Sequence, residues 1–155
     1  MMIPGFCRAS VADKLPVYAA LASLLGVPLH AAESPKTGTF DISPAAAVTI
    51  DSENLIELYQ SVPDLRIVDT RYHEDYVLGH IELSSNLPMN KADCGSLSKI
   101  TANKDTAIVF YCNGGDGGPS IDAIQVASAC GYRRLFWLRG GFIEWQDKDY
   151  PFAIE

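Results

Sequence analysis

The residue best suited to covalent chemistry is Cys112, which stands between an apolar run and a loop rich in glycine. The run is 107–111, and the loop is Asn113-Gly114-Gly115-Asp116-Gly117-Gly118, followed by Pro119 and Ser120. Glycines allow backbone N–H groups to turn toward one point and hold negative charge. A helix that begins at Pro119 adds the positive end of its dipole. The pattern therefore predicts a site for a thiolate, a persulfide or a bound oxyanion.

Three better-known loops of similar composition do not fit this stretch. A phosphate-binding P-loop needs Gly-Lys-Ser/Thr, whereas Gly118 is followed by Pro119. A dinucleotide-binding Gly-x-Gly-x-x-Gly that begins at Gly115 needs glycine where Ser120 stands. A cysteine-dependent phosphatase needs arginine at position 118 to grip phosphate in a bidentate manner. Nucleotide binding and phosphatase chemistry are therefore disfavoured.

The other cysteines and the histidines show no metal-ligand spacing, so we expect no metal and no cofactor. Cys94 is interpreted as an incidental surface residue of a loop, and a resolving thiol for Cys112 is the alternative. Cys130 shares an apolar helical spacing with Ala123 and Ala127, which predicts a core residue.

The elements that must position Cys112 alternate between strands and helices. Strands are expected at 65–69, 107–111 and 135–138, with a brief extended piece at 85–88. Helices are expected from Asp51 or Ser52, at 73–78, within 91–100, from Pro119 to Cys130 and at 142–146. The run 107–111 is apolar throughout, as in a strand buried on both faces of a parallel sheet. The alternation predicts an α/β domain with a mostly parallel central sheet flanked by helices. Ligands of such sheets bind beyond the carboxyl ends of the strands, where Cys112 stands.

A series of short motifs, in order, resembles the rhodanese-like domain over roughly 48–154. The motifs are Asp69-Thr70-Arg71, Tyr76-Val77-Leu78-Gly79-His80-Ile81, Asn86-Leu87-Pro88, Tyr111-Cys112, Gly131-Tyr132, Leu138-Arg139-Gly140-Gly141-Phe142-Ile143-Glu144-Trp145 and Tyr150-Pro151. Each motif is short, and their shared order and spacing carry the resemblance.

The resemblance implies sulfur transfer. Cys112 would be the nucleophile that attacks the outer sulfur of a donor such as thiosulfate, a polysulfide or a persulfide. It would become a persulfide, held by the amides of 113–118 and by Ser120, and would pass the sulfur to a thiol acceptor or a partner protein. Asp69 and Arg71 are expected to form a structural ion pair, with substrate contact by Arg71 as the alternative. His80 is expected to be a hydrogen-bonded structural residue.

The loop departs from the family in its charge. Family loops usually carry a basic residue near the cysteine, whereas the charged residue of this loop is Asp116. Arg71 and Arg139, each near the end of a strand, are the candidates to restore positive charge. Thiosulfate is therefore a poor expectation as donor, and a neutral or protein-bound persulfide stays open. A catalytically weak or inactive module that acts through a partner protein or a membrane complex is the alternative function, and a redox or phosphatase enzyme is a third.

The composition is that of one globular domain. The chain has 155 residues, 48% of them hydrophobic, and a formal net charge of −7. The longest cluster of basic residues is Arg133-Arg134, so we expect no nucleic-acid partner.

The first residues resemble a targeting segment. Arg8 and Lys14 precede an apolar stretch at 15–29, and Ala31 and Ala32 follow it. We expect residues 1–32 to be a signal peptide or an N-terminal membrane anchor, 33–47 a linker and 48–155 the rhodanese-like domain. The first case predicts export, as to a bacterial periplasm. The second predicts membrane association through 15–32, and a folded helix is a third interpretation.

Overall fold

The computed structural model describes residues 47–155 of the protein. The expected signal or anchor at 1–32 and almost all of the expected linker at 33–47 lie outside the described residues. Within 47–155, none of the helices has both the length and the apolar character needed to span a membrane.

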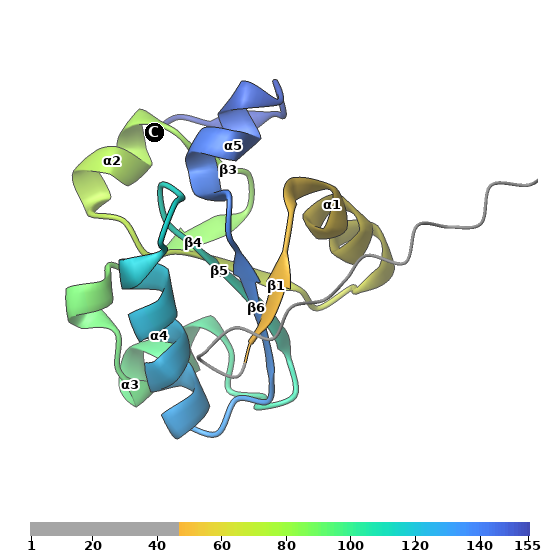
Figure 1. Ribbon diagram of the computed structural model, residues 1–155. Coiled ribbons are helices and arrows are strands. Elements are labelled where there is room, and N and C mark those ends of the chain that lie inside the picture. Colours follow the sequence, from red (N-terminus) through yellow and green to blue (C-terminus); the bar gives the residue numbers. More distant parts are fainter. Residues whose placement is uncertain (1–46) are drawn as a thin grey trace, which may run out of the picture. The chain divides into compact units, whose positions relative to one another are not determined.

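The centre of the domain is a five-stranded parallel sheet with the order β1-β6-β5-β2-β4 (Figure 1). Its strands are β1 (Val48–Ile50), β2 (Arg66–Asp69), β4 (Ser84–Asn86), β5 (Ala107–Tyr111) and β6 (Arg134–Leu138). Every neighbouring pair is parallel, so the carboxyl ends of all five strands lie at one edge. A separate antiparallel pair joins β3 (His80–Ile81) to β7 (Phe152–Ala153). The predicted α/β class and the mostly parallel sheet are confirmed.

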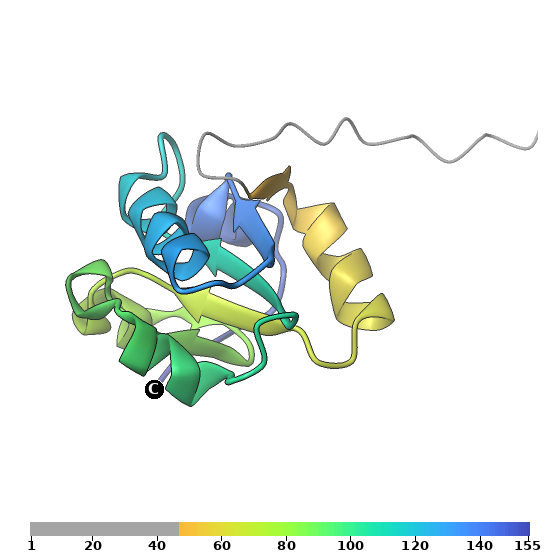
Figure 2. The same ribbon diagram turned by 90° about the horizontal axis from the view of Figure 1, so that it is seen from below.

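Helices cover both faces of the sheet. They are α1 (Ser52–Ser61), α2 (His73–Leu78), α3 (Cys94–Ile100), α4 (Gly118–Ala129) and α5 (Gly141–Asp147), with a short 3₁₀ turn η1 (Met89–Lys91). Figure 2 shows α3 and α4 on one side of the sheet and α1 on the other.

The alternation of side chains along β5 explains its continuous apolar sequence. Ile108 and Phe110 pack into a core with residues of α3 and α4, while Val109 and Tyr111 pack into a second core with residues of α1 and α5. All four side chains are fully buried. A strand between two cores has no polar face, so the prediction of a strand buried on both sides is confirmed.

Two helices begin at aspartates that act as reciprocal caps. The Asp51 carboxylate accepts a hydrogen bond from the Asn54 N–H at 2.8 Å, and the Asn54 side chain accepts from the Asp51 N–H. Asp93 and Ser96 form the same arrangement at the start of α3. Each cap satisfies amides that the first helical turn leaves without partners. Of the two expected caps of α1, Asp51 and Ser52, the structure has Asp51, and the predicted start of this helix is confirmed.

The interpretation of Cys94 is wrong. Cys94 is the first residue of α3, and it forms a disulfide with Cys130 at the end of α4, with a Cα–Cα distance of 5.4 Å. Cys130 packs at the edge of the core, as expected, but its sulfur is bonded. Cys94 is therefore neither an incidental thiol nor a partner of Cys112. The sequence separation of 36 hid the pairing, because only the packing of α3 beside α4 brings the two cysteines together.

Candidate active site

Cys112 lies at the carboxyl end of β5, the central strand of the sheet. It is the free cysteine of the described residues, and 6% of its surface is exposed. It lines a cavity of about 370 Å³. The cavity is lined by Thr70, Arg71, Tyr72, Asp75, Met89, Asn90, Cys112, Asn113, Gly114, Gly118 and Pro119. The thiol is therefore held by a buried strand and opens on a hollow of ligand size.

Glycines give the loop after Cys112 its shape. Gly114, Gly115 and Gly117 have φ angles of +129°, +74° and +64°, a region that side chains other than glycine rarely enter. A Cβ on Gly117 would also collide with the indole of Trp137, and one on Gly114 would collide with the backbone of the loop after β6. The loop closes tightly because these residues have no side chain.

The start of α5 supports the first residues of the loop. The Phe142 N–H donates to the Cys112 carbonyl at 2.8 Å, and the Ile143 N–H donates to the Asn113 carbonyl at 3.0 Å. Gly141, with φ +60°, lies so close that a Cβ there would collide with the Cys112 carbonyl. The Gly-Gly pair after β6 thus lets two backbones meet beneath the candidate nucleophile.

Backbone amides around the thiol are free to hold negative charge. Among residues 47–155, the N–H groups from Asn113 to Gly118 have no backbone hydrogen-bond acceptor. The same loop leads directly into α4, whose twelve residues direct their positive dipole end toward it. The arrangement suits a thiolate or a terminal persulfide sulfur, and the substrate-binding role of these amides stays a prediction.

Arg71 is engaged by the protein itself. Its Nε donates to the Asp69 carboxylate at 3.0 Å, its Nη2 donates to the Gly79 carbonyl at 2.7 Å, and its Nη1 lies 3.4 Å from Asn113 Oδ1. The guanidinium also lies 4.3 Å from the centre of the Phe142 ring. Burial lowers the pKa of Arg71, but the hydrogen bonds and charge of Asp69 outweigh burial and raise it above its ordinary value. The predicted ion pair is confirmed, and both partners are buried.

The predicted site residues fall into three groups. Arg71, Asn113, Gly114 and Gly118 line the cavity of Cys112. Gly115, Asp116 and Arg139 line a neighbouring hollow beside the start of α1 instead. Gly117, in the loop, and Ser120, in the first turn of α4, are buried, and Ser120 Oγ lies 3.6 Å from Cys112 Sγ. Arg139 is exposed and is not brought into the cavity with the thiol.

Sequence reasoning missed the outer wall of the cavity. Tyr72 and Asp75, at the start of α2, and Met89 and Asn90, in η1, line it together with Thr70. Thr70 directly follows β2 and Tyr72 stands three residues beyond the end of that strand, and this position at the carboxyl end of a parallel strand was an available signal. Asp75 adds a carboxylate to the lining.

His80 has the structural role that was expected. Its Nδ1 lies 2.9 Å from the Tyr76 carbonyl, and its ring stacks on that of Tyr76 with centroids 3.8 Å apart. Tyr111 occupies the same region, where its hydroxyl accepts from the Ile81 N–H. Burial raises the pKa of Tyr111 well above its ordinary value, so this phenol stays neutral.

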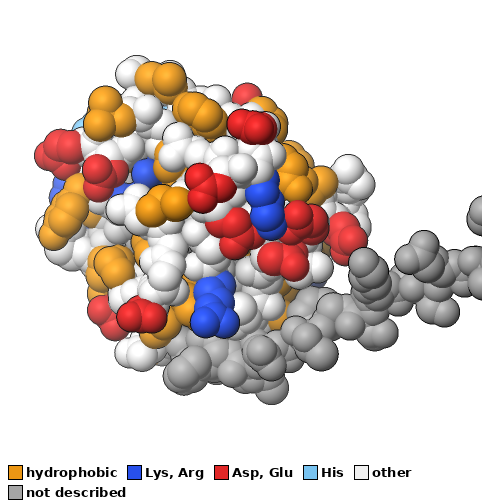
Figure 3. Space-filling view, turned by 45° about the horizontal axis from the view of Figure 1, so that its top comes forward, with side chains coloured by type: hydrophobic (Ala, Val, Ile, Leu, Met, Phe, Trp, Pro, Cys, Tyr) orange, Lys and Arg blue, Asp and Glu red, His pale blue; other side chains and the backbone are white. Residues whose placement is uncertain are grey.

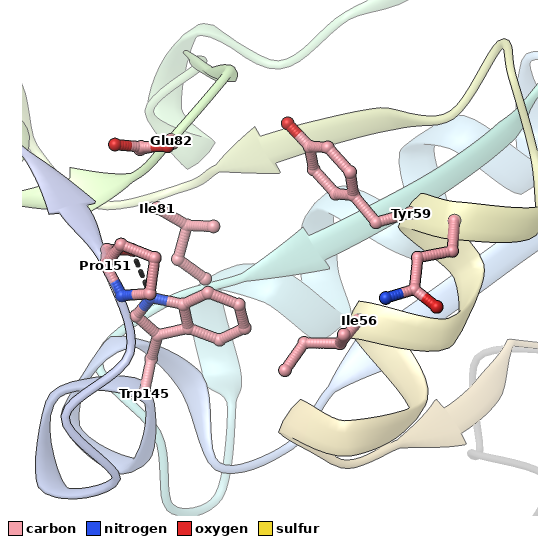
Figure 4. Close-up of a pocket in the computed structure, with 7 residues that line it drawn as sticks. Ile56, Tyr59, Ile81, Glu82, Trp145 and Pro151 are labelled. Carbon is pink, nitrogen blue, oxygen red and sulfur yellow. Dashed lines mark hydrogen bonds between the residues drawn. The ribbon is translucent and has the colours of Figure 1, made fainter.

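Another hollow, of about 290 Å³ and separate from the two described above, lies between α1 and α5 (Figure 4). Ile56 and Tyr59 of α1 face Ile81, Trp145 and Pro151 across it, and the Trp145 Nε1 donates to the Pro151 carbonyl at 2.8 Å. It shares no lining residue with the cavity of Cys112, and its lining contains no nucleophilic cysteine. The candidate active site is therefore the cavity of Cys112.

The surface near the candidate site carries acidic side chains. Figure 3 turns forward the end of the molecule that carries α2 and α5, and acidic groups are spread over this face with few basic ones. Asp75 in the cavity wall and Asp116 in the loop belong to the exposed acidic residues. The potential outside the thiol is therefore less favourable to anions than a basic loop would make it.

Comparisons with known proteins identify the domain. The chain is 32% identical over 102 residues to a sulfurtransferase of Allochromatium vinosum, an alignment that covers 66% of this chain and 91% of the relative. It is 34% identical over 88 residues to an HTH-type transcriptional regulator of Mycobacterium tuberculosis, covering 57% of this chain and 37% of that protein. The solution structure of the rhodanese-like domain of Anabaena Alr3790 superposes with a TM-score of 0.60 at 21% identity, covering 69% of this chain and 79% of that one. The family model of the rhodanese-like domain matches residues 52–148. The chain therefore belongs to the rhodanese-like domain family.

Proposed function

We propose that this protein is a sulfurtransferase that carries sulfur as a persulfide on Cys112. The observation that carries the proposal is the free thiol at the end of β5, which opens on a cavity beside amides without acceptors. The similarity to a sulfurtransferase over almost the whole length of that relative supports the same activity.

The chemistry needs two displacements and no outside oxidant. In the first, the Cys112 thiolate attacks the outer sulfur of a donor, a new S–S bond forms at Sγ, and the bond between the two donor sulfurs breaks. The electron pair of that bond leaves on the donor thiolate. In the second, an acceptor thiolate attacks the outer sulfur of the Cys112 persulfide and releases the Cys112 thiolate again. The loop amides stabilise the negative outer sulfur between the steps.

We infer that the donor carries little negative charge, as a hydropersulfide or a protein-bound persulfide does. Arg71 supports this inference, because its donors are engaged by Asp69, Gly79 and Asn113. Asp75 lines the cavity, and Arg139 lines a different hollow. A dianion such as thiosulfate would meet the loop amides without a free basic side chain from the cavity lining.

Intact mass spectrometry tests the persulfide. The full chain is treated with a low-molecular-weight hydropersulfide, and we expect a gain of one sulfur atom that dithiothreitol removes. The Cys112→Ser variant should gain nothing on the peptide that holds residue 112, because it lacks the nucleophile, and peptide mapping separates this from any reaction at Cys7. A Cys94→Ser, Cys130→Ser double variant is the matched control and should keep the gain. No gain in the wild-type chain with hydropersulfide, polysulfide or thiosulfate would contradict the proposal and favour a binding module.

We also propose that the domain works in an oxidising compartment after export, as in a bacterial periplasm. The disulfide between Cys94 and Cys130 supports this, because such bonds are rare in the reducing cytosol. The test is acid-quenched alkylation of the protein taken from its own host, before any reductant is added. Labelling of Cys112 without labelling of Cys94 and Cys130 is expected, and labelling of all three would overturn the proposal.

A further inference from the structure

A buried tryptophan lies behind the candidate nucleophile. Trp137 of β6 directs its indole beneath the loop, where its Nε1 donates to Ser120 Oγ at 3.0 Å. Ser120 is fully buried in the first turn of α4, and its Oγ lies 3.6 Å from Cys112 Sγ and 2.9 Å from the Gly117 carbonyl. Three residues from different elements thus form one chain of contacts that ends at the sulfur.

The indole restricts what the serine can do. A hydroxyl has one proton and two lone pairs, whereas an indole N–H can only donate. Because Trp137 occupies a lone pair of Ser120, the serine proton is directed to its two remaining partners, the Gly117 carbonyl and Cys112 Sγ. Without the indole, both lone pairs of the hydroxyl would be open to the proton of a neutral Cys112 thiol, whereas with the indole in place only one is. The indole therefore favours the orientation in which Ser120 donates.

We propose that Trp137 is a positioning residue that acts through Ser120 to stabilise the thiolate of Cys112. The proposal rests on the function proposed above, for which the thiolate is the reactive form. When the sulfur is anionic, the serine proton turns from Gly117 to Sγ. When Sγ forms the new S–S bond and loses its charge, the hydrogen bond returns to Gly117, so no proton leaves Ser120.

The geometry of the loop agrees with this role. Gly117 approaches the indole so closely that a Cβ would collide with the ring, and its φ of +64° admits no ordinary side chain without strain. The loop is thus fitted over Trp137, and Gly117 provides the acceptor that holds the serine proton when the sulfur is neutral.

The pH dependence of Cys112 alkylation by iodoacetamide tests the proposal without any sulfur donor. In Trp137→Phe and in Ser120→Ala, we expect the midpoint of the rate profile to move up by about one pH unit, the effect of one hydrogen bond to a charged group. The double variant should move no further than Ser120→Ala, because both changes remove the same interaction. Trp145→Phe is the matched control: it loses a buried indole hydrogen bond to Pro151, away from Cys112, and its midpoint should stay unchanged.

An unchanged midpoint in Trp137→Phe, or fully additive shifts in the double variant, would overturn the proposal. If Trp137→Phe does not fold, the Trp145→Phe chain provides a second test, since its only tryptophan is Trp137. Its fluorescence should change with pH at the alkylation midpoint, and the step should vanish once Cys112 is alkylated. The absence of such a step would count against the proposal. If the alkylation midpoints of the variants shift as expected but the wild-type chain gains no sulfur in the mass experiment, only the sulfurtransferase function is contradicted.

Discussion

Two neighbouring backbones fix the position of Cys112. Cys112 directly follows β5, a strand that is fully buried, and its carbonyl accepts a hydrogen bond from the Phe142 N–H at 2.8 Å. The approach of Gly141 makes that hydrogen bond possible, because a side chain there would meet the Cys112 carbonyl. Preorganisation of this kind costs no rearrangement when the sulfur reacts, which is why the loop can serve covalent chemistry.

One exposed leucine has a strained backbone conformation. Leu83 has φ +62° in the turn between β3 and β4 and is 80% exposed. An L-residue in this region costs about 1–2 kcal/mol, and glycine avoids the cost at the expense of chain entropy. Leu83→Gly should therefore raise the free energy of unfolding by about 0.5–1 kcal/mol, measured by urea denaturation. Asp149→Gly, at φ +54°, is the control with a smaller expected gain, because aspartate tolerates this region better. A loss of stability in Leu83→Gly would show that the leucine side chain packs usefully.

The elements that the sequence predicts best are those that pack against a core, with β5 buried throughout and α4 buried along one face. The apolar run of β5 and the spacing of α4 follow from contact with a core, so their patterns are local and readable. β1, β3 and β7 have two or three residues each, too few for a period, and they exist only through partners far along the chain. The same limit applies to the site. The buried strand, the cysteine and the glycines after it predict the cavity of Cys112. The position of Arg139 in the neighbouring hollow depends instead on how β1 and α1 pack beside the loop, which no local pattern shows.

The disulfide between α3 and α4 is expected to stabilise the fold. It joins two cysteines with a sequence separation of 36 and restricts the unfolded chain. Replacing Cys94 and Cys130 by serine should lower the free energy of unfolding by about 2–4 kcal/mol, measured by urea denaturation with and without reductant. The variant should be insensitive to reductant, whereas the wild type should lose stability in it. The rate of Cys112 alkylation is the internal control and should change little, because the disulfide lies at the far end of α4 from Ser120. Equal stability of variant and wild type would mean that the two helices hold together without the bond.

The charge of the whole molecule acts on every substrate that approaches the cavity. The chain has a formal net charge of −7, Figure 3 shows a face with many acidic and few basic groups, and the arginine that lines the cavity of Cys112 is already paired. An acidic surface repels anions over a Debye length of about 10 Å at 0.1 M salt. Under the proposed function, selection among sulfur donors would therefore depend on the surface as well as on the loop.

The salt dependence of sulfur loading separates the contribution of the surface charge from that of the loop. Raising the ionic strength should accelerate sulfur loading of Cys112 by the dianion thiosulfate, because salt screens the repulsion, and should have a smaller effect on loading by a hydropersulfide, whose reacting group carries at most one negative charge. Asp75→Asn removes a charge from the cavity wall and should raise the thiosulfate rate about twofold to fivefold at low salt. Asp105→Asn is the matched control, since Asp105 precedes the amino end of β5, pairs with Arg133 and should not alter either rate. If thiosulfate loading instead slows with salt, then attraction by the loop amides and the dipole of α4 dominates the field at Cys112, and the inference of a donor with little charge fails.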